Sequence, residues 1–349
     1  MTRALGTAVA LIGVLGATPD AALLRAMNLA GGTEEVITVW RYVAVGLICL
    51  AVAVYNEGGV GPLLKGIVRS PGPILMAAVL MLGINLGFTI SLLKARCAAP
   101  AQSAAATVDP AKALLLISLN PLWSAILGVI VLGDALPMRT ILCNVAAICS
   151  MVLVFVPNVL AAMNGEPPPP SAEGRMLSVY SYTVAAAEEN PVMVLIPLAT
   201  GMLQALFLIY VRYVSMKNPD VSFESVPAFG AAFTAIAPTI TALSAGVSLT
   251  GGLQPIFWGL LFLMGLGLGA YNVACVVAPK YITGAEVALI LLLETVGGPI
   301  WVYLIYGDVP NNWTIASCTL LVASLLVHEI AGMMSSGEDH KTTLEPGVR

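Results

Sequence analysis

The stretch Ala-Leu-Leu-Leu-Ile-Ser-Leu-Asn, residues 113–120, decides the fold, because a similar stretch, Val-Ala-Leu-Ile-Leu-Leu-Leu-Glu, returns at residues 287–294. Each stretch ends in a polar residue, Asn120 or Glu294, and each is followed 13 residues later by Gly-Asp. At an offset of 174 residues, one half of the chain therefore matches the other. Tandem copies of long apolar segments are typical of transporters.

The composition indicates a membrane protein. Of the 349 residues, 58% are hydrophobic and 10% are charged, and the mean hydropathy is +0.93. Soluble domains carry about 25% charged residues, so a water-soluble fold could not bury this much apolar surface. We expect a multi-pass integral membrane protein, in a membrane that the sequence does not identify.

Ten apolar segments are long enough to be membrane-spanning helices, which need roughly 20 mostly apolar residues. None alternates with a period of two as a strand would, so the predicted class is all-α. The predicted spans are residues 4–28, 35–55, 73–94, 111–132, 138–157, 191–213, 225–247, 254–278, 285–306 and 312–334.

These spans divide into two repeats of five helices. The first repeat covers residues 1–157 and the second covers residues 191–334. Residues 158–190 form a polar, proline-rich linker between them, and residues 335–349 form a polar C-terminal tail. Because five is an odd number, the second repeat enters the membrane from the opposite side. The sequence therefore predicts two inverted five-helix repeats.

The distribution of Lys and Arg favours an N-terminus on the inner side of the membrane, where positive charge is enriched. The predicted inner set is Arg3, Lys65, Arg69, Arg139, Arg212, Lys217, Lys280, Lys341 and Arg349. The predicted outer set is smaller: Arg25, Lys94, Arg96, Lys112 and Arg175.

Several short motifs accompany the repeat. They are Pro19-Asp20, Leu24-Arg25, Trp40-Arg41, Asn120-Pro121-Leu122, Gly133-Asp134, Leu293-Glu294-Thr295-Val296 and Gly298-Pro299-Ile300-Trp301. With these motifs the chain resembles the drug/metabolite transporter superfamily, in its EamA-type permease branch. The resemblance spans almost the whole chain, except the central linker and the tail, and the last motif is its most specific part.

The resemblance implies a ten-helix carrier with two inverted bundles around a central cavity, working by alternating access. The family usually has Gly-Glu where this chain has Gly133-Asp134 and Gly307-Asp308, which leaves a carboxylate at each helix end. About eight extra residues between the third and fourth spans, in the region of residues 97–109, are a further departure. Substrates across the superfamily range from amino acids to nucleotide sugars, so the resemblance does not choose one.

Glu294 and Asn120 are the first candidates for a binding site. A charged group near the bilayer centre costs about 2.5 to 3.5 kcal/mol, so one that is retained there usually faces the protein interior. The two residues occupy equivalent positions in the repeats, which predicts that they meet near the midplane, where such carriers bind their substrates. Alternatively, Glu294 only hydrogen-bonds a neighbouring helix.

Asp20 follows Pro19, which interrupts a helix and can open a binding or gating point. Arg25 and Arg41 are candidate partners of Asp20, although both arginines could instead reach the lipid headgroups from helix ends. An inward Arg41 would favour an anionic or zwitterionic substrate. Three amides within spans could line the cavity or merely link helices: Asn85, Gln204 and Asn272.

Other functional classes find less support in the sequence. The two Gly-Asp pairs resemble those of intramembrane aspartyl proteases, but Val131 and Ile305 stand where those enzymes need a further glycine. No His-Glu-x-x-His or Gly-x-Ser-x-Gly motif is present. We see no charge ring or carbonyl filter of a channel, no soluble receptor domain and no basic stripe for nucleic acid. The cysteines lack metal-type spacing, so we expect no metal and no cofactor.

The function expected from the sequence is secondary active transport of a small polar organic metabolite by alternating access. Efflux of amphipathic drug-like compounds is the alternative, and a membrane-embedded enzyme is a weaker one. Expected partners are the small-molecule substrate and membrane lipid. Proton coupling is a hypothesis motivated by Glu294 and Asp20, and the sequence leaves homo-oligomerisation open.

Overall fold

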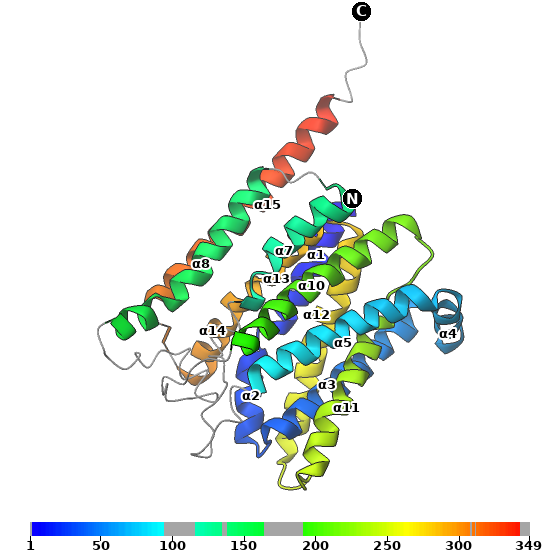
Figure 1. The fold of residues 1–349 in the computed structure, drawn as a ribbon, viewed down its shortest axis with the longest axis vertical. Coiled ribbons are helices and arrows are strands. Elements are labelled where there is room, and N and C mark those ends of the chain that lie inside the picture. The colour runs from blue at the N-terminus through cyan, green and yellow to red at the C-terminus, as the bar shows by residue number, and fades with distance from the viewer. Residues whose placement is uncertain are drawn as a thin grey trace, which may run out of the picture.

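The computed structural model describes residues 2–93, 116–134, 138–163, 191–307, 309–310 and 312–342. Every regular element within these residues is a helix, and none of them forms a strand. The long helices lie side by side along one common direction (Figure 1). The predicted all-α class is thereby confirmed.

The first part of the chain forms eight helical elements in the described residues. They are α1 (Thr2–Ala17), α2 (Asp20–Leu29), α3 (Glu34–Asn56), α4 (Val60–Arg69), α5 (Pro71–Leu93), α7 (Asn120–Leu127), the π-helical turn η1 (Gly128–Leu132) and α8 (Met138–Met163). The short helix α4 was not predicted.

The second part of the chain forms seven such elements. They are α10 (Pro191–Lys217), α11 (Val226–Ser244), α12 (Pro255–Val277), the 3-10 turn η2 (Ala278–Lys280), α13 (Gly284–Leu291), α14 (Leu293–Tyr306) and α15 (Asn312–Thr342).

Seven helical segments are long and apolar enough to cross a membrane. They are Arg3–Leu29, Glu34–Asn56, Pro71–Ser91, Leu195–Lys217, Val226–Ser244, Pro255–Lys280 and Gly284–Tyr306. Three shorter apolar segments coincide with the remaining predicted spans: Asn120–Leu132, Met138–Leu153 and Asn312–His328. Apolar side chains cover much of the outer surface, for example Ile12, which is 65% exposed, and Ile130, which is 73% exposed. The chain thus has the character of a multi-pass membrane protein.

Some predicted boundaries differ from the structure because helices continue into polar sequence. Helix α8 runs to Met163, which is inside the predicted linker, and α15 runs to Thr342, which is inside the predicted tail. The rest of the linker, residues 164–190, the insertion at residues 97–109 and the last seven residues lie outside the described residues.

Helix breaks occur at three places inside the predicted spans. The first lies at Pro19, between α1 and α2, because proline lacks a backbone N–H and its ring obstructs the preceding turn. A turn at residues 118–119 precedes α7, and a break at Leu292 separates α13 from α14. The breaks before Asn120 and Glu294 stand at equivalent positions of the two repeats.

Two glycines with left-handed backbones end the helical segments that carry these breaks. Gly133 follows η1 with a φ of 67°, and Gly307 follows α14 with a φ of 72°. Glycine adopts this conformation without the steric cost that a Cβ would bring. These are the glycines of the two Gly-Asp pairs, of which Asp308 lies outside the described residues.

Helices from the two parts of the chain pack on each other in a reciprocal pattern. Helix α1 packs on α12 while α10 packs on α5, and α3 packs on α12 while α11 packs on α5. Helix α3 also packs on α11, and α8 lies beside α15 along one edge of the bundle (Figure 1). The tightest crossing joins α1 to α12, where a Cβ added at Gly267 would lie 2.0 Å from the carbonyl oxygen of Gly16.

The two ends of the bundle can be told apart by Arg3 at the start of α1. Its Nη2 lies 2.7 Å from Oε1 of Glu286, at the start of α13. Nearby, Arg212 at the end of α10 donates a hydrogen bond to the carbonyl oxygen of Ile282. The start of α1 and the end of α10 therefore share one end of the bundle, which we call the N-terminal face. The two helices run in opposite directions (Figure 1).

Candidate functional site

Asp20 and Arg41 form an ion pair inside the helix bundle. Nη2 of Arg41 lies 3.0 Å from Oδ2 of Asp20, and the two side chains are 17% and 14% exposed. Asp20 stands at the first residue of α2, where a helix N-terminus favours negative charge. Arg41 on α3 is thus mostly buried and held by a carboxylate within the bundle.

Glu294 joins this pair from the other part of the chain. It is half-buried in the first turn of α14, and its carboxylate lies close enough to Asp20 and Arg41 to interact electrostatically with both. We call Asp20, Arg41 and Glu294 the charged triad. With all three groups ionised its formal charge is −1, because two carboxylates share one guanidinium.

Two tyrosines border the charged triad, and neither was predicted. Tyr42, next to Arg41, has its hydroxyl 3.0 Å from Oγ1 of Thr89 and 3.4 Å from the carbonyl oxygen of Asn85. Tyr271 on α12 lies within electrostatic range of Glu294, as does Cys275 one turn later. Hydroxyls inside apolar spans are the sequence signal that would have pointed to these tyrosines.

Gln204 is connected to the triad through Tyr271. Its Nε2 donates a hydrogen bond of 3.2 Å to the Tyr271 hydroxyl. Gln204 comes from α10 and Tyr271 from α12, so a chain of contacts links α10, α12 and α14 to the charges on α2 and α3. Of the sequence candidates, Asp20, Arg41, Gln204 and Glu294 are therefore brought together.

The remaining candidates stand apart from the charged triad. Asn120 is only 5% exposed at the start of α7, and its Oδ1 accepts a hydrogen bond from Ser124 at 3.1 Å. Asn272 donates to the carbonyl oxygen of Leu268, one turn earlier in its own helix. Asn85 contributes its backbone oxygen to Tyr42 and Thr89. Among the described contacts, none joins Asn120 to Glu294, so their meeting stays a prediction.

Some hydrogen-bond acceptors of the charged triad have no donor partner among the described residues. Oδ1 of Asp20 is buried and accepts no hydrogen bond within the structure described. The carboxylate of Glu294 likewise receives none from the described residues, its interactions being electrostatic. Buried acceptors normally have partners, and leaving one unpaired costs about 1 to 3 kcal/mol. A ligand with donor groups would form the hydrogen bonds that these acceptors lack.

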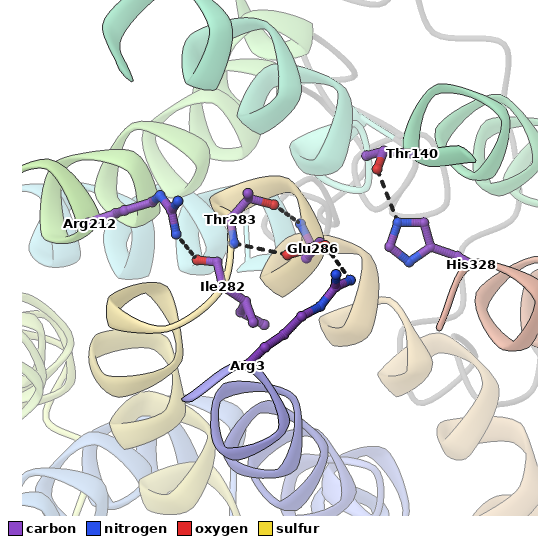
Figure 2. Close-up of polar contacts among 7 residues, drawn as sticks. All are labelled: Arg3, Thr140, Arg212, Ile282, Thr283, Glu286 and His328. Carbon is purple, nitrogen blue, oxygen red and sulfur yellow. Dashed lines mark hydrogen bonds and ion pairs between the residues drawn. The ribbon is translucent and has the colours of Figure 1, made fainter. Parts of the chain in front are cut away.

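A second polar region occupies the N-terminal face (Figure 2). Glu286 accepts from Arg3 and also completes a capping box with Thr283, in which each side chain binds the other's backbone N–H. Arg212 reaches the carbonyl oxygen of Ile282 and, at 3.5 Å, Oδ2 of Asp134. For Arg3 and Arg212 the sequence indicated only a preference for the inner side of the membrane.

Several contacts of this face join the two predicted repeats. Arg3 pairs with Glu286 and Asp134 pairs with Arg212. On the exposed rim Arg69 lies 3.3 Å from Asp220. Between α8 and α15, at the edge of the bundle, Oγ1 of Thr140 lies 3.1 Å from Nε2 of His328 (Figure 2). By contrast, the pair between Lys280 and Glu224, at 3.8 Å, lies within the second repeat.

Aromatic contacts lie towards the opposite face of the bundle. The guanidinium of Arg25 lies 4.1 Å from the ring centroid of Tyr306, whose hydroxyl donates to the carbonyl oxygen of Ala22 at 3.0 Å. Trp40 donates to the carbonyl oxygen of Leu249 at 2.8 Å. The contacts of Tyr306 and Trp40 again connect the first part of the chain with the second.

Metal chemistry has no visible basis in this region. Among the described residues, no group of three or more His, Cys, Asp or Glu side chains is arranged to hold a metal ion. The charged triad itself has two carboxylates and one guanidinium, so its chemistry is the binding of charged or hydrogen-bonding groups.

Comparison with known proteins adds information on the fold. No protein-family model matches the sequence, and no curated protein matches it. One solved structure, described only as "Crystal structure of protein", superimposes with a TM-score of 0.64 at 16% identity, over 94% of this chain and 98% of that chain. At this identity the likeness shows a shared fold and nothing of function. The resemblance to the drug/metabolite transporter superfamily therefore stays a prediction.

Proposed function

We propose that this protein is a secondary active transporter, which moves a small polar organic metabolite across a membrane by alternating access. The observation that carries the proposal is the charged triad, assembled inside apolar helices from α2, α3 and α14. Each of these charges lies within a segment long and apolar enough to span a membrane. Charges retained within apolar spans are costly and usually mark the path of a substrate or an ion, which supports the proposal.

The finer architecture proposed is ten membrane crossings in two inverted five-helix repeats. It is supported by the opposite directions of α1 and α10 and by the reciprocal packing of α1 on α12 and α10 on α5. The left-handed glycines Gly133 and Gly307 and the helix breaks that precede Asn120 and Glu294 stand at matching positions. Broken helices near the midplane are where inverted-repeat carriers place their binding sites.

Alternating access requires contacts that can break on one side while the other side closes. The pairs Arg3 with Glu286, and Asp134 with Arg212, each join the two repeats at the N-terminal face. We propose that these pairs hold this face closed and separate when the site opens towards it. Both pairs are more buried than exposed, with Glu286 at 9% and Arg212 at 17%. Opening this face would return the separated charges to water, which offsets part of the cost of breaking the pairs.

A counterflow experiment tests the proposed function. The purified full chain would be reconstituted in liposomes loaded with one unlabelled compound and diluted into a trace of the same compound, labelled. The panel would cover amino acids, amines, nucleosides and sugar phosphates. A carrier produces transient accumulation of label above equilibrium, whereas a channel produces none.

We expect saturable counterflow for one class of the panel, reduced at least tenfold by Glu294→Gln. The matched control is Asp220→Asn, because Asp220 is an exposed carboxylate on the rim. Transport of label without counterflow would instead identify a channel. Absence of accumulation beyond protein-free liposomes for every class would contradict the proposal.

A further inference from the structure

The charged triad contains more hydrogen-bond acceptors than donors. Arg41 contributes its guanidinium to Oδ2 of Asp20 at 3.0 Å. Oδ1 of Asp20 remains buried without a partner, and the Glu294 carboxylate receives no hydrogen bond from the described residues. With both carboxylates ionised, the triad therefore has one negative charge in excess, and its one described donor, the Arg41 guanidinium, leaves acceptors of Asp20 and Glu294 without N–H or O–H partners among the described residues.

Simple classes of ligand differ in whether they bring a positive charge and whether they bring N–H or O–H donors. An anion would add to the negative charge and bring further acceptors. A neutral alcohol brings one donor and no charge, and a quaternary ammonium brings charge without donors. A primary or secondary ammonium brings one positive charge and two or three N–H groups, which form strong charge-assisted hydrogen bonds with carboxylates.

We propose that the charged triad binds an organic ammonium ion, whose N–H groups donate to Asp20 Oδ1 and to the Glu294 carboxylate. The inference rests on the proposed transport function, for which it names the substrate class. It replaces the expectation of an anionic or zwitterionic substrate, because the inward Arg41 is already paired with Asp20.

The same carboxylates offer a basis for exchange against protons. A proton and an ammonium ion each add one positive charge to the triad, so the two cannot both be accommodated at the same low cost. The groups that face the carboxylates are Arg41 and Tyr42 from α3 and Tyr271 and Cys275 from α12. Arg41 is the one cation among these described groups, so a proton on Glu294 or Asp20 competes directly with the ammonium ion, and we expect ammonium binding to weaken as the pH falls.

The first test compares four probes that share a benzyl group. They are benzylammonium, benzyltrimethylammonium, benzyl alcohol and benzoate, each titrated into the purified full chain while its apparent melting temperature is recorded. A ligand that binds only the folded protein raises this temperature. We expect saturable stabilisation by benzylammonium, at least tenfold weaker binding of the trimethyl compound, and no shift with the alcohol or benzoate.

The second test removes one carboxylate while preserving its shape. Glu294→Gln and Asp20→Asn are each expected to weaken benzylammonium binding at least tenfold, whereas Asp220→Asn, which removes an exposed carboxylate, leaves it unchanged. If either variant fails to fold, the probe series with the unaltered protein still decides. A larger shift with benzoate than with benzylammonium, or no shift with benzylammonium, would overturn the inference.

Failure of this inference can be told apart from failure of the proposed function. Counterflow of a neutral or anionic panel compound, without benzylammonium binding, would leave a carrier with a different substrate class. Benzylammonium binding that depends on Glu294, without counterflow of any amine, would leave the cation site intact and remove the transport function.

Discussion

Gly297, three residues after Glu294 on α14, allows this helix to approach the break that carries Asp20. A Cβ added at Gly297 would lie 2.1 Å from Cγ2 of Thr18, which precedes the break between α1 and α2. The hydroxyl of Thr18 also accepts a hydrogen bond of 3.0 Å from Trp301. Thus α14 rests directly against the break that carries Asp20, and this contact places carboxylates from both parts of the chain together.

Replacing Gly297 should therefore disturb the site more than the fold. In Gly297→Ala we expect α14 to move away from Thr18, with a loss of about 1 to 3 kcal/mol in unfolding free energy and at least tenfold weaker benzylammonium binding. The measurements are chemical denaturation in detergent and thermal titration. Gly259→Ala is the control, because a Cβ there meets nothing within 4 Å. Equal binding by both variants would contradict the assigned role of Gly297.

The ion pair between Asp20 and Arg41 gives a second prediction at this scale. Removing one partner of a buried pair leaves an uncompensated charge and costs about 3 to 5 kcal/mol, whereas removing both costs less. We expect Asp20→Asn and Arg41→Gln to lower the unfolding free energy singly, and the double variant to regain part of the loss. Denaturant unfolding of all four proteins measures the coupling. Additive losses would show that the two side chains do not stabilise each other.

At the scale of single elements, small residues determine which helices can touch. Helices α1 and α12 approach so closely at Gly16 and Gly267 that each backbone meets the other directly. Such crossings are common between membrane helices, because packing and not hydrophobicity drives their association. The packing of α1 on α12 is one member of the reciprocal contacts that support the inverted repeat.

A methyl group at this crossing should push the two helices apart. In Gly267→Ala the new Cβ would face the carbonyl oxygen of Gly16 at 2.0 Å, and a backbone atom cannot move aside cheaply. We expect a loss of about 1 to 3 kcal/mol in unfolding free energy, against no loss for Gly259→Ala in the same helix. Denaturant titration in detergent compares the two, and equal stabilities would show that α1 and α12 are less tightly packed.

The sequence predicted helices better than it predicted their contacts. Long apolar runs determine helices in lipid irrespective of their neighbours, so the all-helical class was predicted correctly, with seven helices long enough to span a membrane and three shorter apolar helices at the other predicted spans. Helix α4 was missed because it is short and amphipathic. Asp20, Arg41 and Glu294 stood out as charges in apolar runs. Their partners could not be predicted, because contacts between residues far apart in the chain depend on how the helices cross. Tyr42 and Tyr271 escaped notice for this reason, whereas Arg41 was named as a candidate partner of Asp20 because the two residues are close in the sequence.

For the whole molecule, the ion pairs of the N-terminal face connect the two predicted repeats, whereas Lys280 and Glu224 connect elements within the second predicted repeat. If the repeats move against each other during transport, contacts of the first kind must open and contacts of the second kind need not. This difference provides a direct test of motion.

We expect cross-linking of positions 3 and 286 to stop counterflow. Arg3→Cys with Glu286→Cys, in a background with the native cysteines replaced, would be treated with a short bifunctional methanethiosulfonate and later with dithiothreitol. Counterflow should be lost and then recovered. The control pair, Lys280→Cys with Glu224→Cys, should retain counterflow when cross-linked. Undiminished counterflow with positions 3 and 286 joined would show that this face stays shut throughout the cycle.

The crossing of Gly16 and Gly267 also constrains any such motion. Two backbones in direct contact cannot move apart without losing that contact, so we expect this crossing to act as the pivot if the two predicted repeats move against each other. The pivot lies on α1 only four residues before Asp20. A rigid body that rotates moves least near its pivot. During the proposed transport cycle, a bound substrate would therefore stay nearly still while the two ends of the protein open and close in turn.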